Sequence, residues 1–167
     1  MEDKLLLELA LKISADLFEK EFDGKVRVTE KLLPLRNYGE FVPESNTIYI
    51  ASQLYVKAPE FAEKVLKHEL CHWYAVSEGI APHDGIVPFE NILRKAKAIT
   101  NGNYPHAVEK TAFKMDVIPM ECSKCHKPQF DRLEMSRDIL LESHCCKADL
   151  VEGKPFAHSY KYYEYVR

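Results

Sequence analysis

Residues 59–79 read PEFAEKVLKHELCHWYAVSEG, and no other part of the chain carries as strong a pattern. Pro59 suits the first turn of a helix, and Gly79 suits the position just after a helix ends. Pro82, three residues further on, prevents the helix from continuing. We therefore expect one helix over residues 59–78.

The run His68-Glu69-Leu70-Cys71-His72 lies inside this predicted helix and matches the HExxH pattern. Residues four apart lie one above the other on a helix, so the two imidazoles can reach one metal ion. Glu69 flanks them and can act as a general base on water whose pKa the metal lowers. Burying three titratable groups without partners would cost about 1–3 kcal/mol each. A metal ion supplies the missing partner, and the ligand types favour zinc.

A third metal ligand is expected downstream, because a catalytic zinc site has three protein ligands and one open position. His83 lies in the short turn that follows Gly79 and can fold back over the helix, so we favour it. His106 is a rival candidate. Asp84 and Glu90 are weaker ones.

Shorter patterns lie on either side of this helix. An amphipathic helix is expected over the first twenty or so residues, and two or three short antiparallel strands over residues 25–51. A further helix that begins near Pro88 is predicted to run to Asn101. The expected fold class is α+β, with a small antiparallel sheet packed with helices over residues 1–105 and a C-terminal module over residues 106–167. The apolar residues of the first helix recur at helical spacing as Leu6, Leu9, Ile13 and Leu17.

The composition excludes several classes of protein. The chain has 167 residues, 46% of them hydrophobic and 29% charged, so it can form a real core, unlike disordered or fibrous chains. The formal net charge of −3 does not mark a bulk polyanion binder. No apolar run reaches the roughly 18 residues that cross a bilayer, and the start Met1-Glu2-Asp3-Lys4 lacks the basic region of a secretory signal. We expect a cytosolic monomer without membrane contact.

Taken together, these features resemble the SprT-like zinc metalloprotease family, to which the DNA–protein crosslink protease Spartan belongs. The resemblance implies a zinc ion held by His68, His72 and His83, with Glu69 as the catalytic carboxylate. The family often places a glycine directly after the third histidine, whereas Asp84 stands there in this chain. The matching parts are the N-terminal helix, Arg36–Glu40, Asn46–Ile50, Lys67–His72, a downstream histidine loop and a cysteine-rich tail.

Four of the five cysteines lie in the C-terminal part of the chain. Cys122 and Cys125 form a metal half-site, since two cysteines at this spacing in a tight turn present both sulfurs to one ion. The resemblance implies a four-cysteine zinc ribbon whose second half is also C-x2-C, but residues 143–146 read SHCC. If Cys146 takes the last position, the third falls on a serine. We expect Cys145 to supply the sulfur, with His144 as the rival ligand.

The sequence thus predicts a zinc metallopeptidase with one catalytic and one structural zinc ion, acting on protein or peptide substrates. The resemblance adds DNA as a partner or activator and DNA-associated proteins as substrates. An alternative is a nucleic-acid-binding or scaffolding protein with structural zinc and a latent protease site. Tyr160, Tyr162, Tyr163 and Tyr165, interleaved with Lys161, could stack on bases. Their spacing also suits an ordinary packed strand, which is the interpretation that we favour.

Overall fold

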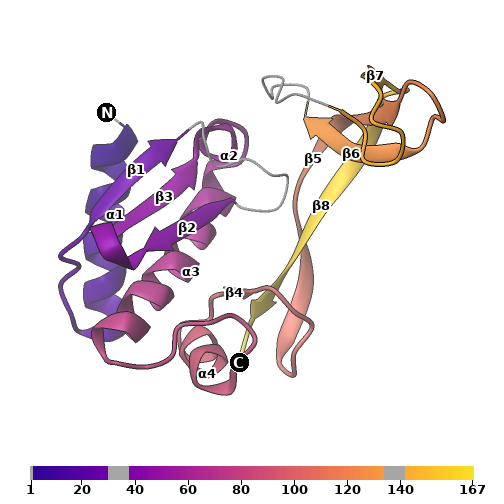
Figure 1. Ribbon diagram of the computed structural model, residues 1–167. Coiled ribbons are helices and arrows are strands. Elements are labelled where there is room, and N and C mark those ends of the chain that lie inside the picture. Colours follow the sequence, from indigo (N-terminus) through magenta and orange to yellow (C-terminus); the bar gives the residue numbers. More distant parts are fainter. Residues whose placement is uncertain (1, 30–37, 134–141) are drawn as a thin grey trace. The chain divides into compact units, whose positions relative to one another are not determined.

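The computed structural model describes residues 2–29, 38–133 and 142–167, so Arg36 and Asn37 lie outside the described residues. The chain divides into two compact units (Figure 1). One, here called the helical unit, consists of the residues up to Ala112 together with Lys161–Arg167, and the other, the cysteine unit, is Phe113–Tyr160. Strands β5 (Ala107–Cys122) and β8 (Phe156–Tyr165) each run from one unit into the other.

The helical unit contains a three-stranded sheet of order β1-β3-β2, with β1 at Lys25–Thr29, β2 at Gly39–Val42 and β3 at Thr47–Ala51. The strand β2 is antiparallel to β3, but β1 is parallel to it. The α+β class is confirmed, and the prediction of an antiparallel sheet is wrong because the sheet is mixed. Alternation of apolar residues identifies strands but not their direction. In the sheet, β3 lies between β1 and β2 and pairs with both.

Two long helices pack on this sheet (Figure 1). Helix α1 (Glu2–Phe18) contacts β1, and α3 (Pro59–Ser77) contacts β2, β3 and α1, while the short α2 (Ser52–Lys57) precedes α3. The face that α1 buries is Leu6, Ala10 and Ser14. Of the other residues in the predicted stripe, Leu9 and Ile13 are half-buried, and only Leu17 is exposed. Small residues suit this face because they let the helix approach its neighbours closely, and the buried Ser14 hydroxyl accepts the Phe22 backbone N–H at 3.1 Å.

Helix α3 ends as the sequence predicts. Gly79 adopts a left-handed conformation with a φ of 67°. Its N–H bonds to the carbonyl of Val76 at 3.2 Å, and the N–H of Ile80 bonds to that of Ala75 at 2.8 Å. These two bonds form a Schellman motif, which glycine favours.

Helix α4 (Val87–Lys95) is shorter than predicted. Lys97 takes a left-handed conformation with a φ of 50°, and the N–H groups of Lys97 and Ala98 bond back to Arg94 and Leu93. The chain then continues into β4 (Ile99–Thr100), which pairs with Tyr163 and Glu164 of β8. The prediction of helix to Asn101 is wrong because strand pairing with a segment far along the chain outweighs the local helical pattern.

In the cysteine unit, β6 (Pro128–Leu133) and β7 (Leu150–Glu152) both pair antiparallel with β5. Among the residues of this unit whose burial is described, Val117, Cys122 and Ser143 are buried. The unit therefore has little apolar core of its own. In the described part of the chain, no helix has the length and apolar character needed to cross a membrane.

Candidate metal and catalytic site

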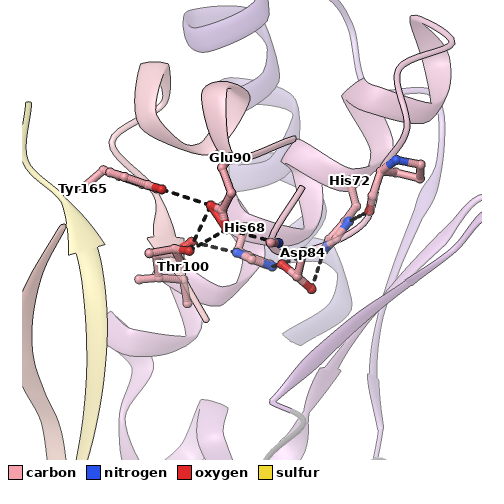
Figure 2. A network of polar contacts seen from close by, with 9 residues as sticks. His68, His72, Asp84, Glu90, Thr100 and Tyr165 are labelled. Atoms are coloured by element: carbon pink, nitrogen blue, oxygen red, sulfur yellow. Dashed lines mark hydrogen bonds and ion pairs between the residues drawn. The ribbon is translucent and has the colours of Figure 1, made fainter. Parts of the chain in front are cut away.

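The two histidines of the HExxH run point into one site. They lie on α3, and ligand atoms of His68, Glu69 and His72 all lie within 4.8 Å of one another. The two Nε2 atoms are 3.1 Å apart (Figure 2). The helical repeat therefore produces the convergence that the sequence predicts.

The other ring nitrogens are held by backbone carbonyls. Nδ1 of His68 lies 2.8 Å from the carbonyl oxygen of Ile99, and Nδ1 of His72 lies 2.6 Å from that of Pro82. A carbonyl oxygen only accepts hydrogen bonds, so each Nδ1 carries the proton and donates. Each Nε2 is then directed into the site, where it can bind a cation or, when the ring is doubly protonated, donate to the Asp84 carboxylate. Metal-binding histidines are commonly oriented in this way.

The carboxylate of Asp84 faces the same two nitrogens. Its Oδ1 lies 3.1 Å from Nε2 of His68, and its Oδ2 lies 3.6 Å from Nε2 of His72. Burial by itself lowers the pKa of His68, but the hydrogen bond to Asp84 and the negative charges of Glu69 and Asp84 raise it to about 9. Burial opposes ionisation of Asp84, yet its hydrogen bonds with the two histidines hold its pKa well below the usual range. The site thus attracts positive charge strongly.

Glu69 is buried beside the histidines. Burial raises the pKa of its carboxyl group, while the two imidazoles and a hydrogen bond from the Phe41 backbone oppose the rise. Strand β2 reaches this close to α3 because residue 39 is a glycine. A Cβ at Gly39 would lie 2.6 Å from Cγ1 of Val65 and 3.1 Å from Cγ of Glu69.

A cleft of about 400 Å³ opens over these groups. Its walls come from β2, α3, the loop after α3 and β4. The cleft gives a substrate access to the histidines and to Glu69. Its lining includes Gly39, Glu40, Phe41, Val65, Val76, His83, Asp84 and Asn101.

His83, the predicted third ligand, also lines the cleft. Like Asp84, it is exposed and lies outside the compact group of ligand atoms, and His106 is exposed too. Glu90 is buried, and its carboxylate accepts hydrogen bonds from Thr100 at 2.8 Å, Tyr165 at 3.1 Å and the Gly85 backbone at 3.3 Å (Figure 2). Glu90 therefore supports the loop of the cleft.

Four cysteines form a second candidate metal site, in the cysteine unit. Ligand atoms of Cys122, Cys125, Cys145 and Cys146 all lie within 4.8 Å of one another. The sulfurs of Cys125 and Cys145 are 3.4 Å apart. His144 is exposed and lies outside this group, and its backbone N–H donates to the Gln129 side chain.

The two turns that carry these cysteines have the same backbone pattern. In the first, the His126 N–H bonds to the Cys122 carbonyl, and the Cys122 N–H bonds to the Lys127 carbonyl. In the second, the corresponding bonds run from Lys147 to Ser143 and from Ser143 to Ala148. Ser143 thus occupies the backbone position that Cys122 occupies in the first turn.

Ser143 contributes hydrogen bonds instead of a sulfur. Its hydroxyl accepts the backbone N–H of Ala148 at 3.1 Å and of Cys146 at 3.4 Å. A hydrogen bond from Ser143, followed by backbone N–H groups of the turn, lowers the pKa of Cys122 to about 6. A thiol that ionises this readily is a good metal ligand.

The comparisons with known proteins agree with the motif. The chain is 23% identical over 153 residues to a protein named Protein SprT-like from Lysinibacillus sphaericus (strain C3-41), and the match covers 87% of this chain and 93% of that protein. The match supports membership of the SprT-like family. No family model matches the chain, and no solved structure does.

The sequence predicted the residue types of this site better than its backbone contacts. Asp84, a weaker candidate than His83 in the sequence, contacts both histidines, and the sequence shows it only as a carboxylate in the same loop. The carbonyls of Pro82 and Ile99 give no signal in the sequence, because every residue has a carbonyl. Gly39 could have been noticed as the glycine that begins a strand.

Proposed function

We propose that the chain is a zinc-dependent metallopeptidase of the HExxH type. The observation that carries the proposal is the pair of histidine Nε2 atoms, 3.1 Å apart and beside the buried Glu69, at the base of an open cleft. A purely structural histidine pair would not need both Nε2 atoms to converge on one point. A metal ion does need this arrangement.

His68, His72 and a third ligand from the loop after α3 would hold the ion. A bound zinc ion lowers the pKa of water and polarises a carbonyl group. Glu69 takes the proton from the attacking water and passes it to the leaving amine of the peptide. Its raised pKa suits both steps, because the carboxyl group can hold a proton between them.

The cleft suits an extended peptide. Strand β2 lies at one end of the described sheet order, and Gly39, Glu40 and Phe41 line the cleft. A peptide can bind such a strand through backbone hydrogen bonds, which do not depend on its sequence. We therefore expect unfolded or flexible protein segments as substrates.

The four cysteines of the cysteine unit would hold a structural zinc ion. A small unit with little apolar core gains its folding free energy from such an ion.

DNA remains a predicted partner. The tyrosines of β8 do not strengthen the nucleic-acid alternative, because Tyr162 packs against Phe61 with ring centroids 4.8 Å apart, and Tyr160 stacks on Phe113 at 4.6 Å.

The deciding experiment compares wild type with Glu69→Gln, both loaded with zinc, on an unfolded protein substrate. Wild type should cleave it, and Glu69→Gln should retain zinc while losing at least ~100-fold in rate. Glu63→Gln is the matched control, since Glu63 is an exposed residue of the same helix and should cleave like wild type. Adding single-stranded DNA and a DNA-bound substrate tests the predicted role of DNA.

The absence of cleavage by fully zinc-loaded wild type, with or without DNA, would overturn the proposal. Equal rates for wild type and Glu69→Gln would reject the role given to Glu69.

A further inference from the structure

We propose that Glu90 of α4 is a positioning residue that fixes both histidines of the HExxH run in the orientation that a metal ion requires. It acts through the two backbone segments whose carbonyls hold the imidazole rings. The inference rests on the proposed function, because it concerns the same site. Glu90 is buried and has no part in the proton transfers assigned to Glu69.

The first argument concerns the two carbonyls that hold the rings. Nδ1 of His68 donates to the carbonyl of Ile99, and Nδ1 of His72 donates to that of Pro82. Ile99 begins β4, whereas Pro82 lies in the loop after α3, so neither carbonyl belongs to the helix that carries the histidines. Both segments must therefore be held in place for the two Nε2 atoms to converge.

The Glu90 carboxylate connects these two segments (Figure 2). The Thr100 hydroxyl lies 2.8 Å from Oε1 and 3.0 Å from Oε2 of Glu90, and Thr100 directly follows Ile99. Oε1 also accepts the backbone N–H of Gly85 at 3.3 Å, in the same loop as Pro82. One side chain thus holds the two carbonyls in place relative to each other.

The second argument is the position of the first turn of α4, which carries Glu90. The preceding residue, Phe89, is fully buried and stacks on the His72 ring, with centroids 4.2 Å apart and planes 18° apart. It also meets the His68 ring edge-on, with centroids 5.9 Å apart. The turn therefore lies against both imidazoles. Phe89 restricts the ring planes, and Glu90 holds the carbonyls to which the rings donate.

The third argument is the cost of burying a charge. Glu90 accepts hydrogen bonds from the Thr100 hydroxyl, the Gly85 N–H and the Tyr165 hydroxyl, and these donors are uncharged. An apolar side chain of similar size would pack here without the desolvation cost of a carboxylate. Hydrogen bonds to a charged acceptor are stronger and more directional than apolar contacts. The carboxylate therefore gives the two segments a precision that packing alone would not.

The test follows the Nδ1–H protons of His68 and His72 by ¹⁵N NMR of the full chain, with and without Zn²⁺. Zn²⁺ affinity is measured by chelator competition, and the thiolate absorption of Co²⁺ separates the cysteine site from the histidine site. Glu90→Ala removes both links, so both Nδ1–H protons should exchange with water at least about tenfold faster. Zn²⁺ binding at the histidine site should weaken about 10-fold or more. Glu90→Gln keeps an acceptor oxygen and should restore part of both losses.

Thr100→Val separates the two histidines. It removes the hydroxyl at nearly constant size, which breaks the link to β4 and leaves the link to Gly85. Exchange should rise about tenfold for His68 Nδ1–H and less than about threefold for His72 Nδ1–H. Ile92→Val is the matched control, because Ile92 is a buried apolar residue of the same helix and its shortening lowers stability without removing either link. Exchange and Zn²⁺ affinity in Ile92→Val should stay within about threefold of wild type.

Unchanged Nδ1–H exchange in Glu90→Ala, shown to be folded by far-UV circular dichroism, would overturn the assignment. If Glu90→Ala does not fold, Glu90→Gln and Thr100→Val decide. Equal effects of Thr100→Val and Ile92→Val would also reject it, because lost stability would then explain them. If wild type binds metal in the cysteine site alone, the proposed function fails. The metal-free spectra still judge Glu90 in that case, since unchanged exchange at His68 in Thr100→Val rejects its role and faster exchange supports it.

Discussion

The Tyr165 hydroxyl donates a hydrogen bond to Oε2 of Glu90 at 3.1 Å. The same buried carboxylate accepts hydrogen bonds from Thr100 of β4 and from the Gly85 backbone, next to Asp84 (Figure 2). One side chain of α4 therefore joins the end of β8 to the loop beside the two histidines. The last strand of the chain thus supports a site formed by residues far earlier in the sequence.

Tyr165→Phe should lower the free energy of unfolding by about 1–2 kcal/mol, because a buried carboxylate loses one of its donors. Urea denaturation measures this change. Tyr163→Phe is the control, since the Tyr163 hydroxyl contacts the exposed Glu109, and its removal should cost less than about 0.5 kcal/mol. Equal losses in the two variants would contradict the role given to the contact with Glu90.

The sequence predicts those features that depend on neighbouring residues. The HExxH run, the helix that carries it and its glycine stop are local patterns, and the structure has the helix and its stop where they were expected. The mixed sheet and the early end of α4 depend on pairing with distant strands, β3 with β1 and β4 with β8. The contact of Asp84 with the two histidines depends on how the loop after α3 folds, which residue spacing does not show.

Gly39→Ala should reduce both stability and turnover. The added Cβ would lie 2.6 Å from Cγ1 of the buried Val65, so β2 must move away from α3 at a cost of about 1–3 kcal/mol. That movement also carries the Phe41 backbone away from Glu69. Stability and kcat are measured on the same preparation.

Gly79→Ala provides the comparison for Gly39→Ala. Gly79 has a φ of 67° and no atom within 4 Å of an added Cβ. The substitution should cost about 1 kcal/mol through the backbone alone, with turnover unchanged. If the two variants lose turnover equally, the close approach of β2 to Glu69 does not matter for catalysis.

The ion pairs of Glu164 should make stability depend on pH. Its carboxylate contacts Lys110 at 2.7 Å and also Lys64 of α3. Burial raises the pKa of Glu164, but the hydrogen bonds from the two lysines outweigh it and hold the pKa below the ordinary value of 4.5. Since the folded-state pKa is the lower one, the stabilisation is present above pH 4.5 and is lost as the pH falls through the folded-state value.

Glu164→Gln should therefore cost on the order of 1–2 kcal/mol at neutral pH. The difference from wild type should shrink when denaturation is repeated in acid. The exposed pair of Glu109 with Lys161 supplies the control, and Glu109→Gln should unfold like wild type. A difference for Glu164→Gln that stays constant between neutral and acid pH would contradict this account.

Removal of metal should unfold the cysteine unit and leave the helical unit folded. Within the described part of Phe113–Tyr160, few side chains are buried, so the unit depends on the metal that its cysteines would hold. Amide NMR spectra with and without a strong chelator should show loss of dispersion for residues 115–155. Survival of that dispersion after complete metal removal would show that the unit folds without an ion.

The final prediction concerns the second cysteine turn, where Ser143 takes the backbone position of a ligand and Cys145 supplies the sulfur. Cys145→Ser should weaken metal binding at this site strongly, because three sulfurs remain in the group. Ser143→Cys restores a sulfur at the regular position, so Cys145→Ser in that background should cost little. Chelator competition on the four proteins of this double-mutant cycle measures the coupling. Equal losses from Cys145→Ser in both backgrounds would mean that a sulfur at position 143 cannot replace the sulfur of Cys145.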